Sequence, residues 1–168
     1  RGCVRVSFSP MPEEVALTCV ARSNEAAGSP VVCTGDMENN HTATPENLVL
    51  EEGDRPLEGW SDKRGQLTWR PLFSADSTPT GQLVTGVAEL QQGGFLALHR
   101  HAQAETYYVL AGEGVVTLDG AEHPVRPGSS VFLPGSSEHG IRNTGTQNLR
   151  FFYALAADDF TDIEYVFS

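Results

Sequence analysis

The chain has 168 residues, a formal net charge of −11 and 39% apolar residues. This length and apolar content suit a single domain with one core. A net charge this negative argues against nucleic-acid binding, which needs clustered basic side chains. No apolar run approaches the ~18 residues of a membrane span, and there is no basic amphipathic stretch. We therefore expect neither a nucleic acid nor a membrane as partner.

Residues 1–45 differ in composition from the rest of the chain. They contain all three cysteines, and a stretch rich in Ser, Asn, Gly and Thr gives them weak periodicity. We interpret residues 1–45 as an N-terminal extension of a domain that spans residues 46–168. Three cysteines without CxxC spacing favour free thiols in a reducing, cytoplasmic setting. Because the chain begins with Arg1, a targeting segment could have been removed before it.

From residue 47 onward, short apolar runs alternate with turns that contain glycine or proline. Asp119-Gly120 separates two such runs and is typical of a hairpin turn. No long helical pattern is present, so many short strands predict an all-β sandwich or barrel. The predicted strands are Leu67–Phe73, Gln82–Leu90, Phe95–His101, Thr106–Leu110, Gly114–Leu118, Val131–Leu133, Gly140–Asn143 and Leu149–Leu155.

Two histidines, His99 and His101, stand two residues apart on a predicted strand, so their side chains share one face. Glu105 begins the next strand, and strand pairing could bring His139 from a later strand to the same point. Three imidazoles and a carboxylate suit Fe²⁺, Mn²⁺, Ni²⁺, Co²⁺ or Zn²⁺ and leave about two octahedral positions open. Open positions favour a catalytic metal over a structural one.

These residues resemble the two sequence motifs of the cupins. The first motif, G-x5-H-x-H-x3-E-x6-G, matches the chain from Gly93 to Gly112. The second, G-x5-P-x-G-x2-H-x3-N, is similar to the chain from Gly128 to Asn143, with Ser136 in place of the usual glycine. The resemblance implies a single cupin barrel, which is a double-stranded β-helix or jelly roll, with one divalent transition metal.

Within the cupins, the chain resembles the small lyases that cleave dimethylsulfoniopropionate (DMSP). Those enzymes place a tyrosine two residues after the metal-binding glutamate, as Tyr107 is here. The run Leu67–Phe73 resembles the strand that carries their pocket tryptophan, here Trp69. The ending 158–165 resembles their tail, which carries a second pocket tyrosine, here Tyr165. The resemblance implies Fe²⁺ or Mn²⁺ as the metal and Tyr107 and Tyr165 as catalytic residues.

Cleavage of DMSP to dimethyl sulfide and acrylate is a β-elimination. It needs a base for the α-proton and stabilisation of the charge that grows on the carboxylate side. A divalent metal bound to the substrate carboxylate suits the second task, and Tyr107 beside it suits the first. Trp69, Phe95, Phe152 and Tyr165 are candidates for an aromatic wall that attracts the sulfonium.

Other interpretations of these residues stay open. Tyr107 could be a core residue that bonds to a ligand carboxylate, Trp69 could pack in the core, and Tyr165 could cover the barrel. Tyr108 should point away from Tyr107, into packing. The same ligand set also serves Fe²⁺ dioxygenases and isomerases of sugars or small acids, and a cupin pocket can bind a small ligand without catalysis. By analogy with small cupins, we expect a homodimer.

Overall fold

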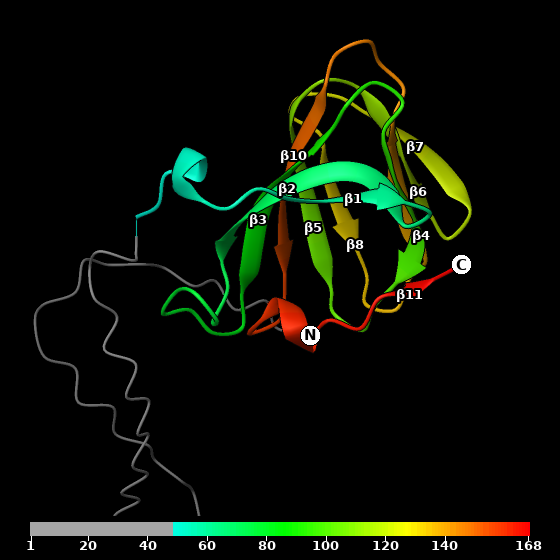
Figure 1. Cartoon of the computed structure of the whole chain (residues 1–168). Helices are drawn as coiled ribbons and strands as arrows, with labels where there is room; N and C mark the ends of the chain where they lie inside the picture. Colours follow the sequence, from blue (N-terminus) through cyan, green and yellow to red (C-terminus); the bar gives the residue numbers. More distant parts are fainter. Residues whose placement is uncertain (1–48) are drawn as a thin grey trace, which may run out of the picture. The chain divides into compact units, whose positions relative to one another are not determined.

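The computed structural model describes residues 49–168, which are almost entirely β as predicted (Figure 1). The predicted extension of residues 1–45, including Cys3, Cys19 and Cys33, lies outside the described residues, so the predicted domain boundary stays a prediction. Eleven strands form one continuous sheet, and every paired strand is antiparallel to its neighbour. No helix in this part of the chain has the length and apolar character needed to cross a membrane.

The elements follow one another in short steps. They are η2 (Glu52–Asp54), β1 (Glu58–Asp62), β2 (Gly65–Phe73), β3 (Val84–Leu90), β4 (Phe95–Arg100), β5 (Glu105–Ala111), β6 (Gly114–Leu118), β7 (Ala121–Val125), β8 (Ser130–Leu133), β9 (His139–Asn143), β10 (Leu149–Leu155), η3 (Phe160–Asp162) and β11 (Val166–Phe167), where η denotes a 3₁₀ helix. All eight predicted strands are present. Three strands were not predicted: β1 and β11, and β7, which is the second arm of the hairpin that turns at Asp119-Gly120.

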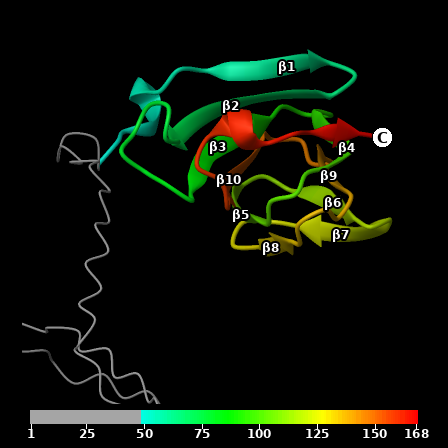
Figure 2. The ribbon, with the colours of Figure 1, turned by 90° about the horizontal axis from the view of Figure 1, so that it is seen from below.

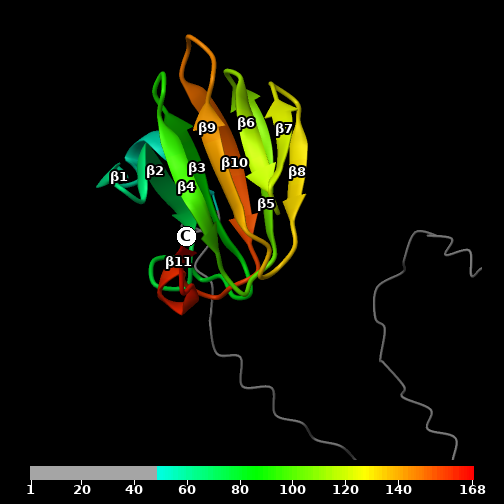
Figure 3. The same cartoon turned by 90° about the vertical axis from the view of Figure 1, so that its right-hand side faces the viewer.

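The sheet bends so that its two ends face each other. Its strand order is β7-β6-β9-β4-β2-β3-β10-β5-β8, with β1 paired to β2 and β11 paired to β4. The strands on one side of β2 lie in front of those on its other side, which gives the two layers of a jelly roll (Figure 3). Seen from below, β1 and β2 lie along one side of this barrel, and the segment from η3 to β11 runs close to its lower end (Figure 2).

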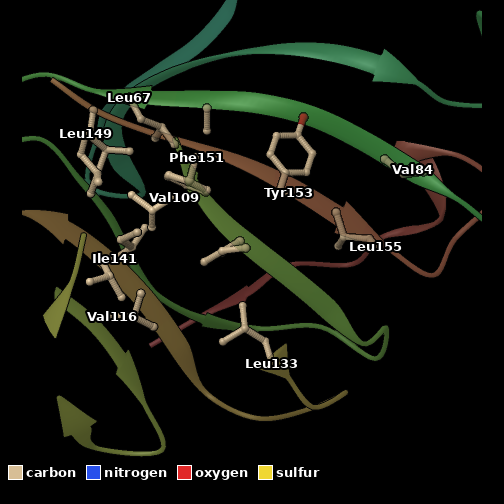
Figure 4. Close-up of a cluster of buried hydrophobic side chains, with 14 of the residues drawn as sticks. Leu67, Val84, Val109, Val116, Leu133, Ile141, Leu149, Phe151, Tyr153 and Leu155 are labelled. Carbon is tan, nitrogen blue, oxygen red and sulfur yellow. The ribbon is translucent and has the colours of Figure 1, made fainter. Parts of the chain in front are cut away.

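The core lies between the two layers, and β10 shows how the sequence builds it. Its burial alternates, with the side chains of Leu149, Phe151, Tyr153 and Leu155 facing inward (Figure 4). This is the two-residue period of a strand with one buried face. Tyr108 pairs with Phe152 on the outer face, and 46% of Tyr108 is exposed. The prediction that Tyr108 points away from Tyr107 is therefore correct, but the prediction that it is packed is wrong.

One buried amide ties three segments together at the end of β9. The Asn143 side-chain nitrogen donates to the carbonyl oxygens of Leu90 (2.9 Å), Gln91 (3.0 Å) and Gln147 (2.8 Å). Its oxygen accepts from the backbone N–H of Gly145 at 2.9 Å. Since only 5% of Asn143 is exposed, water cannot replace these partners.

We expect Asn143→Asp to destabilise the domain by about 3 kcal/mol, because a carboxylate would face three carbonyl oxygens with no proton to donate. The free energy of unfolding in urea measures this loss. The matched control is Gln147→Glu, which makes the same change of group at a neighbouring exposed side chain and should alter stability by less than about 0.5 kcal/mol. Equal stabilities of Asn143→Asp and the wild type would contradict this account.

The turn before His139 contains a serine in a glycine-like conformation. Ser136 has φ = 67°, in the left-handed region, at the position where the second cupin motif usually has glycine. Its backbone N–H donates to the carbonyl oxygen of His101 at 2.7 Å, so the turn is attached to the chain beside a candidate ligand. The left-handed conformation costs a residue with a Cβ roughly 1 kcal/mol.

Relief of this strain should make Ser136→Gly more stable than the wild type by about 0.5 kcal/mol, after the greater flexibility of glycine in the unfolded chain is subtracted. Thermal unfolding measures the difference. The neighbouring Ser137→Gly is the control, because Ser137 has no positive φ and its hydroxyl donates to the carbonyl oxygen of Pro134 at 2.6 Å. It should lose stability, and a gain in both variants would show that the turn conformation is not the cause.

Candidate metal centre

Strand pairing brings the candidate ligands to one place. In the pairing of β4 with β9, His99 lies directly opposite His139, and their ring centroids are 4.2 Å apart. His101 follows the end of β4, and Glu105 is the first residue of β5. Each of the three histidines contributes one ring nitrogen to a group of three atoms that all lie within 4.8 Å of one another. All four residues are buried, and each is at most 6% exposed.

Backbone carbonyls orient all three imidazoles in the same way. The Nδ1 atoms of His99, His101 and His139 lie 2.8, 3.0 and 3.0 Å from the carbonyl oxygens of Ala97, Gln103 and Ser137. A carbonyl oxygen only accepts, so each Nδ1 carries the proton. In the neutral ring, Nε2 then presents a lone pair, which is the arrangement of a metal-binding histidine.

The atoms at the centre of the site are therefore acceptors that face one another. The Nε2 atoms of His101 and His139 lie 3.2 and 3.3 Å from Oε2 of Glu105. Within the described part of the chain, Nε2 of His139 is buried and has no hydrogen-bond partner. Lone pairs this close in a buried site repel one another unless a cation lies between them. Three buried histidines and a carboxylate arranged in this way fit a divalent metal.

The protonation states agree with this fit. Burial, together with the neighbouring His139 ring, lowers the pKa of His99 to about 4, so the imidazole is neutral at physiological pH. A neutral imidazole with an Nε2 lone pair is the form of histidine that binds metals.

A cavity of about 320 Å³ meets this centre at Glu105, and Tyr107 lies in its wall as well. Most of the remaining wall is aromatic or aliphatic, and it comes from the hairpin of β1 and β2, from β10 and from the C-terminal segment around η3. Its aromatic residues are Trp60, Trp69, Tyr107, Phe151, Tyr153, Phe160 and Tyr165. A ligand in this cavity can reach the side of the centre that Glu105 and Tyr107 form.

The two candidate catalytic tyrosines lie beside the centre. Tyr107 is 1% exposed, and its ring centroid is 4.6 Å from that of Phe151 and 6.5 Å from that of His139. Burial first, and then the charge of Glu105, raises the pKa of Tyr107 well above its usual value. The ring of Tyr165 lies 5.4 Å from each of the His99 and His101 rings, and burial raises its pKa too.

Two of the predicted wall residues are wrong by one position. Trp69 lines the cavity, but Phe95 and Phe152 do not, and Leu96 and Phe151 line it instead. Phe152 lies on the outer face of β10, as its pairing with Tyr108 shows. On β4, the pairing with β9 shifts register between Leu96 and His99. This irregularity breaks the two-residue alternation of side chains along β4. Phe95, four residues before His99, therefore does not face the cavity, whereas Leu96 does.

Several residues of the cavity wall were not predicted from the sequence. Tyr153 alternates with Phe151 on the inner face of a predicted strand, so this periodicity could have identified it. Trp60 and Glu58 lie on β1, whose Glu-Gly-Trp-Ser-Asp sequence has little strand propensity. Asp76 lies in the connection between β2 and β3, where no pattern indicates a site.

Comparisons with known proteins agree with the fold. Residues 86–155 match the family model of the cupin domain. The dimethylsulfoniopropionate lyase DddW of Ruegeria pomeroyi is 40% identical over 128 residues, which are 76% of this chain and 80% of that protein. An oxalate-binding protein of Thermotoga maritima is 28% identical, over 73% of this chain and 94% of its own length.

Among solved structures, a predicted oxalate decarboxylase of Thermotoga maritima superposes with a TM-score of 0.60 at 27% identity. The match covers 66% of this chain and 99% of that one. Since a protein 40% identical to this chain is matched over 80% of its length, and the cupin domain model matches the strands that carry the centre, the chain belongs to the cupin superfamily and resembles its DMSP lyases.

Proposed function

We propose that the protein is a metal-dependent lyase that cleaves DMSP to dimethyl sulfide and acrylate. The 40% identity to a DMSP lyase over most of the chain supports this reaction. The structural observation that carries the proposal is the position of Tyr107, which is buried beside Glu105 at the point where an aromatic cavity meets the candidate metal centre. A proton acceptor there would lie next to the bound end of a small acid.

His99, His101, Glu105 and His139 would hold the metal, for which we propose Fe²⁺ or Mn²⁺, with Ni²⁺, Co²⁺ and Zn²⁺ also suited to these donors. When bound, a divalent metal would supply Lewis acidity toward the substrate carboxylate and a positive charge that favours the phenolate of Tyr107. The backbone carbonyls that accept from the three Nδ1 atoms keep the ligand nitrogens aimed at one point.

Tyr107, once ionised to the phenolate that the metal charge would favour against the effect of burial, would take the α-proton of the substrate. The electrons of the broken C–H bond form the C=C bond of acrylate, and the C–S electrons leave with sulfur as neutral dimethyl sulfide. Trp69 and Trp60, whose ring centroids are 5.1 Å apart, would contact the sulfonium by cation–π attraction. Tyr165 packs against His99 and His101 and would close the centre to water.

A small-acid-binding cupin is the second candidate, because the oxalate-binding relative is matched over 94% of its length. Such a protein would retain a carboxylate ligand without turnover, whereas an Fe²⁺ dioxygenase would need oxygen. The expected homodimer stays a prediction. The exposed Tyr108, Leu110 and Phe132 on β5 and β8 are apolar side chains that a second copy would cover.

Purified protein loaded separately with Fe²⁺, Mn²⁺, Ni²⁺ or Zn²⁺ should release dimethyl sulfide from DMSP under anaerobic conditions. Headspace gas chromatography measures the product. Release should stop after chelation and return with added metal, and air should not increase it, because β-elimination needs no oxidant. A folded, metal-loaded sample that releases no dimethyl sulfide with any of the four metals would refute the lyase.

Loss of the base should slow the reaction without removing the metal. Tyr107→Phe is expected to lower kcat by about 100-fold or more, as general-base variants do, with metal content unchanged. The control is Tyr108→Phe, since Tyr108 is on the same strand but faces outward. Full activity of Tyr107→Phe would show that Tyr107 is instead a packing residue beside Glu105.

A further inference from the structure

His101 lies in a short connection between two strands, and this connection takes its position from other parts of the chain. Residues 101–104 join β4 to β5, and Glu105 follows them. The carbonyl oxygen of His101 accepts from the backbone N–H of Ser136 at 2.7 Å, which fixes the main chain of this ligand. Its imidazole is oriented separately, since Nδ1 donates to the carbonyl oxygen of Gln103 at 3.0 Å. The direction of the His101 lone pair therefore depends on where Gln103 lies.

The side chain of Gln103 is attached to the C-terminal segment, by which we mean residues 156–168. Its Nε2 atom donates to the carbonyl oxygen of Asp162 in η3 at 3.1 Å. At the start of the same segment, the backbone N–H of Ala156 donates to the carbonyl oxygen of Ala104 at 3.2 Å. Both contacts join the connection to the segment that runs close to the lower end of the barrel (Figure 1). Gln103 thus holds a ligand with its carbonyl and η3 with its amide.

The C-terminal segment is itself anchored, so it can hold Gln103 in place. The Asp159 carboxylate accepts from the backbone N–H of Thr161 at 2.7 Å, and the Asp162 carboxylate accepts from that of Asp159 at 3.2 Å. This reciprocal pair caps η3 and fixes the turn that presents the Asp162 carbonyl. Further along, Phe167 of β11 lies opposite His99 in the pairing with β4. The segment is therefore fixed both at η3 and at β11.

Packing alone does not account for a glutamine at this position. Gln103 is half-buried, and its Oε1 atom is buried without a hydrogen-bond partner within residues 49–168. A buried oxygen of this kind costs free energy, and methionine would have a similar length without it. Asp162 is exposed, so water could replace the amide as the donor to its carbonyl. The hydrogen bond from Nε2 hence adds little to the stability of the fold, whereas it does fix the position of the Gln103 main chain.

We propose that Gln103 is a positioning residue of the candidate metal centre. Its amide fastens the connection of residues 101–104 to η3, and its carbonyl, held in place by this attachment, aims Nε2 of His101 at the metal. The C-terminal segment thus raises the affinity for the metal without contributing a ligand. The inference rests on the metal centre of the proposed function, and it is independent of the reaction catalysed there.

The test is Gln103→Met in the full chain, with Co²⁺ as the probe. Methionine keeps the backbone carbonyl and the side-chain length but removes the donor. Competition with a chelator should give a dissociation constant about tenfold higher than that of the wild type, the lower end of the loss expected when the support of a metal-bound histidine is removed. The visible absorption of bound Co²⁺, which reports the geometry of its ligands, should change as well. The urea midpoint of the metal-free protein should stay the same, whereas a purely structural role would lower that midpoint and leave the spectrum unchanged.

Two further variants control for the substitution and for the route of the effect. Gln91→Met makes the same change at an exposed glutamine whose carbonyl oxygen also accepts a hydrogen bond, from Asn143 at 3.0 Å, and it should bind Co²⁺ as the wild type does. Asp159→Ala removes the cap of η3 and should weaken Co²⁺ binding by a smaller factor than Gln103→Met. Because both residues act through η3, the double variant Gln103→Met/Asp159→Ala should bind Co²⁺ no more weakly than Gln103→Met alone.

An unchanged dissociation constant and Co²⁺ spectrum in Gln103→Met would overturn the positioning role, and so would an equal loss in Gln91→Met or full additivity in the double variant. The result is separable from the proposed reaction, because metal binding is measured without substrate. Metal affinity that depends on Gln103, in a protein that releases no dimethyl sulfide, would uphold the positioning role and refute the lyase. Release of dimethyl sulfide by a Gln103→Met variant with wild-type metal affinity would do the reverse.

Discussion

Three backbone carbonyls set the orientation of the histidines on which the centre depends. By accepting from Nδ1, the carbonyls of Ala97, Gln103 and Ser137 turn the three Nε2 lone pairs toward one another and toward Glu105. The acceptors are buried, so a metal cation among them would make their proximity favourable. The surrounding fold can be understood as the scaffold that holds these carbonyls and strands in place.

The turn around Ser136 belongs to that scaffold. It connects β8 to His139, and its backbone N–H bonds to the carbonyl oxygen of His101, so two candidate ligands are linked through one hydrogen bond. Asn143 performs a similar task at the other end of β9, where its amide joins the ends of β3 and β9 to the loop before β10. The left-handed turn at Ser136 and the Asn143 amide, whose nitrogen and oxygen are both hydrogen-bonded, position the two ends of β9. His139 lies on this strand.

The spacing of the ligands and the alternation of apolar residues are local properties, and the sequence by itself determined them. His99, His101, Glu105 and His139 could be named together, eight of the strands could be placed, and the cupin barrel followed from the motifs. Only the tertiary structure decided which aromatic residues face the cavity. The register shift on β4 reverses the expected direction of Phe95, and the pairing of β1 with β2 brings Glu58 and Trp60 to the wall. These features depend on hydrogen bonds between strands distant in the chain, and a strand's own sequence does not encode which partner it meets or where the register slips.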